Sequence, residues 1–183
     1  ATYEWLLGLK PFWNSMLISA LRVLTSVPLT LLFTVLAAYP LSKSSDRFLG
    51  RTVFSWLFFI TMILGGGMTV STLGLIGNFW ALVIPNSVVA YYVLITLNFF
   101  RGLPEEMEEA ARIDGASEWD ILFRIVLPVS TPVLATIAVF CSLAQWNEWF
   151  LGMIYMRTPD QYPLMSYLQT TVVNVNLEQL SPE

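Results

Sequence analysis

Long runs of apolar residues without a charge constrain the fold of this chain more than any other feature. Residues 23–41 and 79–100 contain no Asp, Glu, Lys or Arg, and each run is close to the roughly 20 residues with which a helix crosses a bilayer. Overall, 56% of the residues are apolar and only 12% are charged, about half the usual charged share of a soluble domain. Backbone polar groups in lipid must bond within their own segment, so the sequence predicts an all-α integral membrane protein.

Two further runs bring the expected number of spanning helices to four. Residues 52–64 would rise only about 20 Å as a helix, so residues 65–68 are needed to complete that crossing. The fourth run begins near Ile121, continues to Trp146 and is followed by a second apolar patch at residues 149–156. We also expect Pro28 and Pro40 to bend the first span, Pro85 to interrupt the third, and Arg22 to lie just outside the first.

The basic residues predict how these spans are oriented. Residues 42–51 and 101–124 each contain three basic residues, whereas residues 65–78 contain none. Two crossings separate the two basic loops, so both lie on one side of the membrane. By the positive-inside rule that side is the cytoplasm.

The loop at residues 101–128 has its own folding signals. Pro104 and the acids that follow it suit the first turn of a helix, and Gly115 suits the left-handed residue that ends one. Ser117 and Asp120 have the spacing of a capping box that starts a second helix. We therefore expect a charged helical hairpin between two apolar runs, with a narrow face formed by Met107, Ala110 and Ala111. A solvated amphipathic loop is the simpler interpretation of the same signals.

Several classes of site lack the residues that they need. The chain has no histidine, its one cysteine cannot form an internal disulfide, and the glycines at 65–67 lack the lysine context of a phosphate-binding loop. We expect no catalytic residue, no metal site and no nucleotide bound by this chain. Two alternatives were weighed: an intramembrane enzyme with Asp114, Gly115 and Asp120 at a metal, and an ion channel or secondary transporter, for which only Arg22 is suitable.

The segment from Glu109 to Pro128 carries a longer pattern: EAA, three residues, Gly, nine residues, Ile, one residue, Leu, Pro. It resembles the coupling loop of the membrane subunits of ATP-binding-cassette importers. The resemblance implies a permease core of the MetI-like fold, whose loop docks on an ATPase subunit and whose motif glutamate, Glu109, meets a basic residue there. The implied coupling residues are Glu109, Ala110, Ala111, Asp114, Gly115, Ile125, Leu127 and Pro128.

The resemblance also implies partners. These are a second, non-identical permease, two ATP-binding subunits that carry ATP and Mg²⁺, and an extracytoplasmic solute-binding protein, with no role for nucleic acid. The chain itself is expected to be a multi-pass protein of a prokaryotic cytoplasmic membrane. The usual first and last helices of the family are missing and the loop at 65–77 is short, so we expect residues 1–183 to be one transmembrane domain that is incomplete at both ends, with the coupling loop at 101–128 within it.

The run from Gln145 to Phe150 is similar to a WNEF-type sequence in carbohydrate importers, which implies a sugar or oligosaccharide as substrate; an importer of amino acids, phosphate or similar solutes is the alternative. Residues that can line the substrate path are Tyr91, Tyr92, Asn98, Gln145, Trp146, Asn147 and Glu148. Each has a structural interpretation as well: tryptophans anchor spans at the membrane boundary, amides bond neighbouring helices, and Glu148 can cap or pair near the interface.

Overall fold

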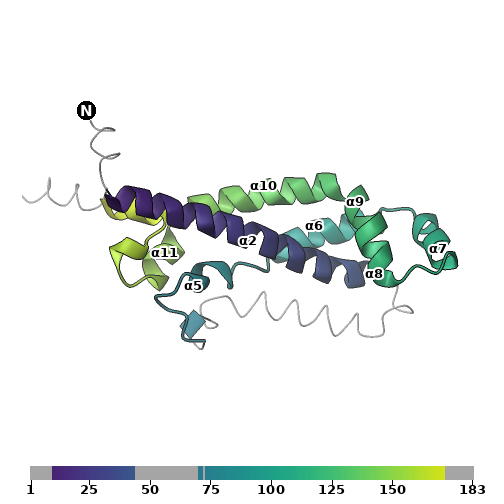
Figure 1. The fold of residues 1–183 in the computed structure, drawn as a ribbon, viewed down its shortest axis with the longest axis horizontal. Coiled ribbons are helices and arrows are strands. Elements are labelled where there is room, and N and C mark those ends of the chain that lie inside the picture. Colours follow the sequence, from purple (N-terminus) through teal and green to yellow (C-terminus); the bar gives the residue numbers. More distant parts are fainter. Residues whose placement is uncertain (1–9, 44–69, 72, 172–183) are drawn as a thin grey trace, which may run out of the picture. The chain divides into compact units, whose positions relative to one another are not determined.

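The computed structural model describes residues 10–43, 70–71 and 73–171, and these residues form helices and turns with no strand among them (Figure 1). The α-helices are α2 (Lys10–Ser42), α5 (Trp80–Val83), α6 (Ala90–Arg101), α7 (Glu105–Ile113), α8 (Glu118–Ile121), α9 (Leu127–Val129), α10 (Thr131–Asn147) and α11 (Phe150–Tyr155). A π-helix, η1 (Leu122–Val126), joins α8 to α9, a 3₁₀ turn, η2 (Pro159–Gln161), follows α11, and residues 164–171 are helical again. The prediction of an all-α protein is confirmed for this part of the chain.

Helix α2 has the pattern of a helix in lipid rather than in water. It is 33 residues long, or about 50 Å, and it continues through both Pro28 and Pro40. Leucines lie on its outer surface, among them Leu24 with 69% of its side chain exposed. Its small polar residues and one arginine are buried instead, spaced three or four apart: Ser15, Ser19, Arg22, Ser26, Thr30 and Thr34. Residues at these spacings share one face of a helix, so α2 turns its polar face inward.

The structure describes two compact units, and α2 and α10 contribute to both. The first lies within Ala1–Val27, Gly66–Ser87 and Cys141–Glu183, and the second within Pro28–Gly65 and Val88–Phe140. In the second unit, the core joins α2, α6 and the α8–η1 segment through Val35, Ala37, Ala38, Tyr39, Leu41, Val93, Leu97, Phe100, Ile121, Leu122 and Val126. In the first, a smaller core contains Val70, Ala81, Leu82, Tyr155 and Met156.

The four predicted spans agree with the helices of the structure to different degrees. The first lies within α2, which by length and composition can cross a membrane alone. The fourth corresponds to two helical segments, Glu118–Val129 and Thr131–Asn147, that meet this test together but are bent by 74°. Residues 79–100 do not form one helix: α5 and α6 are separated by a turn that contains Pro85. The twelve residues of α6 rise about 18 Å, less than the bilayer core. The predicted span at 52–64 lies outside the described residues.

Arg22 corrects the predicted start of the first span. The charge-free run at 23–41 predicts that Arg22 lies just outside the membrane segment, but α2 begins at Lys10 and contains Arg22 near its middle, with none of the side chain exposed. The prediction was wrong because a charged residue next to an apolar run usually marks the end of the membrane-spanning segment. Here it is paired with a carboxylate from another part of the first unit, as described below.

Two prolines account for the bend before α10. Pro128 lacks an N–H group and crowds the carbonyl one turn earlier, and η1 widens the helix just before it, with the Leu127 amide donating to the Leu122 carbonyl. Pro132 likewise cannot donate to the Pro128 carbonyl, which instead accepts a hydrogen bond of 2.8 Å from the Thr131 hydroxyl. The chain therefore changes direction where two prolines remove backbone hydrogen bonds from the helix.

Candidate functional site

The hairpin at α7 and α8 lies beyond the C-terminal end of α2 in the second unit (Figure 1). Helix α7 follows Pro104, and three glutamates occupy its first turn, where they face the positive end of the helix dipole. It ends at Asp114 and Gly115, whose φ of 84° lies in the left-handed region. The Gly115 amide donates to the Arg112 carbonyl and the Ala116 amide to the Ala111 carbonyl, each at 3.0 Å. This is a Schellman cap, so the predicted role of Gly115 is confirmed.

The second helix of the hairpin starts with the predicted capping box. The Ser117 hydroxyl accepts a hydrogen bond of 3.2 Å from the Asp120 amide, and the Asp120 carboxylate accepts one of 3.3 Å from the Ser117 amide. The hydroxyl also donates to Asp120 Oδ2 at 2.6 Å. These bonds hold the pKa of the Asp120 carboxyl below its usual value. A carboxylate used in this way is a helix cap, which does not favour the metal site considered for an intramembrane enzyme.

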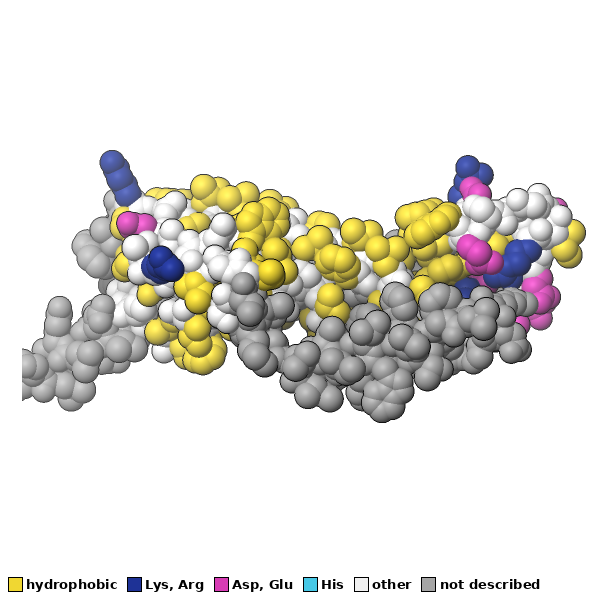
Figure 2. Space-filling model, turned by 90° about the horizontal axis from the view of Figure 1, so that it is seen from below, with side chains coloured by type: hydrophobic (Ala, Val, Ile, Leu, Met, Phe, Trp, Pro, Cys, Tyr) yellow, Lys and Arg dark blue, Asp and Glu magenta, His cyan; other side chains and the backbone are white. Residues whose placement is uncertain are grey.

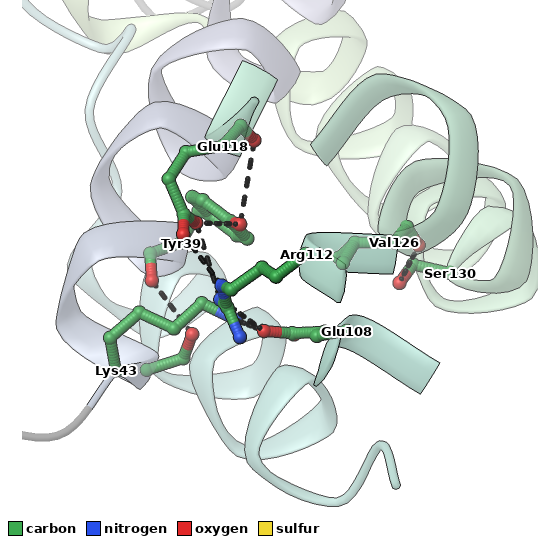
Figure 3. Close-up of polar contacts among 8 residues, drawn as sticks. Tyr39, Lys43, Glu108, Arg112, Glu118, Val126 and Ser130 are labelled. Carbon is green, nitrogen blue, oxygen red and sulfur yellow. Dashed lines mark hydrogen bonds and ion pairs between the residues drawn. The ribbon is translucent and has the colours of Figure 1, made fainter. Parts of the chain in front are cut away.

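Five charged and polar side chains join the hairpin to the C-terminal end of α2, where Tyr39 lies in the last turn and Lys43 directly follows the helix (Figure 3). Lys43 binds the Glu108 carboxylate with its ammonium group, which also lies 4.4 Å from the centre of the Tyr39 ring. Arg112 reaches Glu108 Oε2 at 3.1 Å and Glu118 Oε1 at 2.8 Å. The Tyr39 hydroxyl donates to Glu118 Oε2 at 2.8 Å. We call Tyr39, Lys43, Glu108, Arg112 and Glu118 the α2–hairpin cluster.

Electrostatics inside the α2–hairpin cluster favour its charged form. Two cations face two carboxylates, so the cluster is formally neutral. The hydrogen bond from Arg112 is the largest cause that holds the pKa of the Glu118 carboxyl below its usual value, and the bond to Glu118 raises the pKa of Arg112. Glu108 is only 8% exposed, and a carboxylate this deeply buried is stable only when paired. The cluster therefore supports one particular arrangement of α7, α8 and α2.

The outer face of the hairpin differs from the predicted one. Met107 and Ala110 are exposed as expected, but Ala111 is half-buried against the core of the second unit, as is Ala116. Ile113 is exposed instead, with 87% of its side chain accessible. Charged and apolar side chains alternate at the hairpin end in Figure 2. The exposed surface thus comprises Glu105, Glu106, Met107, Glu109, Ala110, Ile113 and Asp114, which we call the hairpin outer face.

The remaining residues predicted for coupling lie where the chain turns from the hairpin into α10. Ile125 belongs to η1, while Leu127 and Pro128 belong to α9. Leu127 packs against the core of the second unit, and Ile125 is half-buried. These three residues therefore lie at the bend before α10 and not on the hairpin outer face.

The residues predicted for a substrate path fall into two groups. In the second unit, Tyr91 is 65% exposed on α6, Asn98 is exposed, and Tyr92 is buried. In the first unit, Gln145 and Trp146 end α10 with Asn147, whose amide donates to the Leu143 carbonyl at 2.9 Å. Gln145 is buried, Trp146 is half-buried and Asn147 is exposed.

Glu148 has a structural role that the sequence analysis gave as an alternative. Its carboxylate accepts a hydrogen bond of 3.1 Å from Arg22 Nη2 and another of 2.8 Å from the Leu151 backbone amide. The first contact pairs the buried arginine of α2, and the second satisfies an amide in the first turn of α11. Glu148 therefore fastens the break between α10 and α11 to α2 within the first unit.

Sequence reasoning missed the α2–hairpin cluster. From the sequence, Lys43 and Arg112 were used only to orient the two basic loops, and Glu108 was used only as an acid in the first turn of a helix. Tyr39 was given no role in a site. The spacing of Glu108 and Arg112, four apart on one helix, is the one signal that could have indicated part of it. Tyr39 and Lys43 are 79 and 65 positions from their partners, which no local pattern reports.

Comparison with known proteins agrees with this geometry. Residues 8–182 match the family described as binding-protein-dependent transport system inner membrane component. Over 176 residues the chain is 35% identical to Protein LplC and 31% identical to the polygalacturonan/rhamnogalacturonan transport system permease protein YtcP, both of Bacillus subtilis (strain 168). Each alignment covers 93% of this chain, but only 59% and 61% of those proteins. The chain thus spans about three fifths of these relatives.

A solved structure is similar over the same region. It is the crystal structure of a bacterial ABC transporter involved in the import of the acidic polysaccharide alginate. The match has a TM-score of 0.86 and 32% sequence identity, and it covers 94% of this chain and 63% of that one. The fold described above is therefore shared with a component of an importer.

Proposed function

Because the chain belongs to the family of inner membrane components of binding-protein-dependent transport systems, we propose that it is the permease subunit of an ATP-driven importer whose α7–α8 hairpin docks on an ATPase subunit. The observation that carries this proposal is the hairpin itself. It is a charged, capped helix pair with an exposed outer face, placed at the end of an apolar helix that turns its polar side chains inward. Such an element can bind a soluble partner without unfolding any spanning helix.

The docking residues follow from exposure. Glu109 and Ala110 lie on the hairpin outer face with Met107 and Ile113, and we propose that Glu109 meets a basic side chain of the ATPase subunit. Ala111 and Gly115 support this face from within, by packing and by turning the chain. ATP and Mg²⁺ are bound by the ATPase subunits, and this chain performs no chemistry. ATP-driven closure of the ATPase pair would move the hairpin and switch the permease between outward-facing and inward-facing states.

For the substrate we propose a sugar, of oligosaccharide size or larger. This proposal is supported by the printed names of relatives: YtcP is named for polygalacturonan and rhamnogalacturonan, and a permease of Halalkalibacterium halodurans that is 31% identical is named for arabino-oligosaccharides. The solved importer carries the polysaccharide alginate. Nothing in the described residues favours an amino acid or phosphate importer, or an intramembrane enzyme.

The remaining components complete the proposal. We propose a second permease, two ATPase subunits and an extracytoplasmic solute-binding protein as partners, with this chain as a multi-pass protein of a prokaryotic cytoplasmic membrane. Tyr91, Tyr92, Asn98, Gln145, Trp146, Asn147 and Glu148 are the candidate residues of the sugar path. Among them Glu148 is already engaged by Arg22, whereas Asn147 and Tyr91 are exposed on their helices.

Copurification tests the docking role directly. The full-length protein is expressed with its neighbouring transport genes, extracted in mild detergent and purified through a tag on this chain alone. We expect an ATP-hydrolysing subunit to be recovered in stoichiometric amount, and we expect Ala110→Arg to abolish its recovery by placing a long cation on the hairpin outer face. Recovery of the tagged chain without an ATPase, under conditions that keep the permease folded, would contradict the proposal.

Asn147→Ala tests the substrate path. If the Asn147 amide contacts a sugar hydroxyl, its removal leaves that hydroxyl unpaired at about 1–3 kcal/mol, so uptake should fall roughly 5- to 160-fold at limiting sugar. The measurement is uptake of labelled oligosaccharide by cells, with recovery of the ATPase subunit as the control for assembly. Unchanged uptake across a range of sugar concentrations would assign the amide to helix packing, through its bond to Leu143.

A further inference from the structure

The α2–hairpin cluster has a role that docking alone does not require. The hairpin is joined covalently to α6 through residues 102–104 and to α10 through η1 and α9. Helix α2 is far away in sequence, and among the described residues side-chain contacts link it to the hairpin. Both hairpin helices contact the C-terminal end of α2 separately: α7 contacts Lys43, the residue after α2, through Glu108, and α8 contacts Tyr39 in the last turn through Glu118.

Arg112 closes these contacts into a ring. It binds Glu108 on its own helix and Glu118 on the next one, while Lys43 lies over the Tyr39 ring on α2. The interactions therefore run from α2 to α7, across the Gly115 turn to α8, and back to α2. A link of this kind resists rotation of the hairpin as well as separation, because it holds two points, Tyr39 in the last turn of α2 and Lys43 just after it.

Burial distinguishes the Lys43–Glu108 side of the ring from a surface ion pair, whereas Glu118 on the other side is 57% exposed. Exposed pairs contribute little to stability because water and salt screen them. In this cluster the Glu108 side chain is 10% exposed and the Lys43 side chain 14%, so a separation would leave a poorly solvated carboxylate with one partner instead of two. Ala111 and Ala116 of the hairpin also pack against the core of the second unit, which contains Ala38 and Leu41 of α2.

We propose that the α2–hairpin cluster makes α2 and the hairpin one rigid body, so that movement imposed on the hairpin by the ATPase subunits is delivered to α2 directly. This inference rests on the proposed docking function. Lys43, Glu108, Arg112, Glu118 and Tyr39 are then positioning residues: they touch neither sugar nor nucleotide, and they determine which helices follow the hairpin.

Spin-label distances test this in the assembled transporter. Labels are placed at Leu36 on α2 and at Trp119 on α8, an exposed hairpin residue outside the hairpin outer face. The full-length protein carries alanine in place of Cys141, the only native cysteine in the described region. The complex with its ATPase subunits is measured without nucleotide and after trapping with ATP and vanadate. We expect the same narrow distance distribution in both states. In Lys43→Met we expect a broader distribution that shifts on trapping, with lower uptake per ATP hydrolysed although the ATPase subunits are still recovered.

Matched variants separate positioning from simple destabilisation. Lys43→Arg keeps a cation and should restore the unsubstituted behaviour, and Arg124→Met removes a cation from the exposed pair with Asp120 and should change nothing. Tyr39→Phe removes only the hydroxyl bond to Glu118, so it decides the question if Lys43→Met does not assemble. The inference is overturned if trapping changes the label-to-label distance in the unsubstituted complex. It is also overturned if Lys43→Met and Tyr39→Phe both give the same narrow, unchanged distance distribution as the unsubstituted complex. Loss of the ATPase subunits from the unsubstituted complex would instead contradict the docking function.

Discussion

At the scale of single residues, Gly115 and the capping residues determine whether a hairpin forms at all. Gly115 has a positive φ, and an added Cβ would meet nothing within 4 Å. Its requirement is therefore conformational rather than steric. Ser117 and Asp120 then satisfy amides of the following helix with their own side chains. Three residues within one short segment thus end one helix and begin the next.

Gly115→Val tests this requirement. The left-handed conformation costs an L-residue about 1–2 kcal/mol, and more for a β-branched one, so the turn should distort and recovery of the ATPase subunit should be lost while the chain still inserts. Gly74→Val is the matched control, because Gly74 also has a positive φ with open space around it, but lies in the first unit. Equal loss of the ATPase subunit in both variants would show a general folding defect instead.

Glu118 makes the stability of the hairpin depend on pH. Its pKa in the folded protein lies below the ordinary value of 4.5, so its contribution is complete above pH 4.5 and is lost as the pH falls through the folded value. We expect Glu118→Gln to lower the melting temperature of the detergent-solubilised protein at neutral pH and to reduce its decline on acidification. Asp120 shifts in the same direction, so part of the decline will remain.

At the scale of helices, close packing in the first unit depends on a glycine in α11. A Cβ on Gly152 would lie 2.1 Å from Ser166 Oγ and 2.9 Å from Pro163 Cδ. Ser166 cannot simply rotate away, because its hydroxyl donates to the Trp149 carbonyl at 2.7 Å. Helix α11 and the segment from Pro163 onward therefore approach each other at a distance that only glycine permits.

Gly152→Ala should consequently destabilise the protein. Overpacking of this kind costs about 1–3 kcal/mol, measurable as a lower melting temperature in detergent. The control is Gly102→Ala, where an added Cβ would come no closer than 3.4 Å to a neighbouring atom, the Phe99 carbonyl oxygen. If both variants melt alike, the contact between α11 and Ser166 does not limit stability.

At the scale of the whole molecule, the distribution of side chains is that of a membrane protein. Helix α2 buries serines and threonines and exposes leucines, the reverse of a helix in water. Because hydrocarbon cannot solvate a hydroxyl or guanidinium group, these groups must face protein. The ion pairs of the hairpin lie at one end of α2, where water is available to the hairpin outer face.

Orientation can be tested with single cysteines in a protein that lacks Cys141. We expect Glu105→Cys, on the hairpin, to resist a membrane-impermeant maleimide added to intact cells, and Leu73→Cys, which replaces an exposed side chain between two predicted spans, to react. Both should react after the membrane is opened. Labelling of Glu105→Cys from outside would reverse the predicted topology and would place the hairpin where no ATPase subunit can reach it.

Much of this structure could be predicted from sequence because the relevant interactions are local. The Schellman cap at Gly115 and the capping box at Ser117 each involve atoms within five residues of one another. The all-helical fold follows from the apolar runs, since backbone N–H and C=O groups in lipid must hydrogen-bond to one another within the segment. The break in residues 79–100 was indicated by Pro85, but its consequence, two short helices in place of one span, was not.

Only the tertiary structure decided which charges are paired and buried. Arg22 was predicted to lie just outside the first span because it directly precedes the charge-free run at 23–41; its partner, Glu148, is 126 positions away. Ala111 was predicted to lie on the docking face, yet it packs against the core of the second unit, on a helix whose Glu108 and Arg112 are paired in the α2–hairpin cluster. An ion pair forms where two helices meet, and which helices meet depends on packing over the whole chain, so the sequence alone determined the hairpin while the fold determined what holds it to α2.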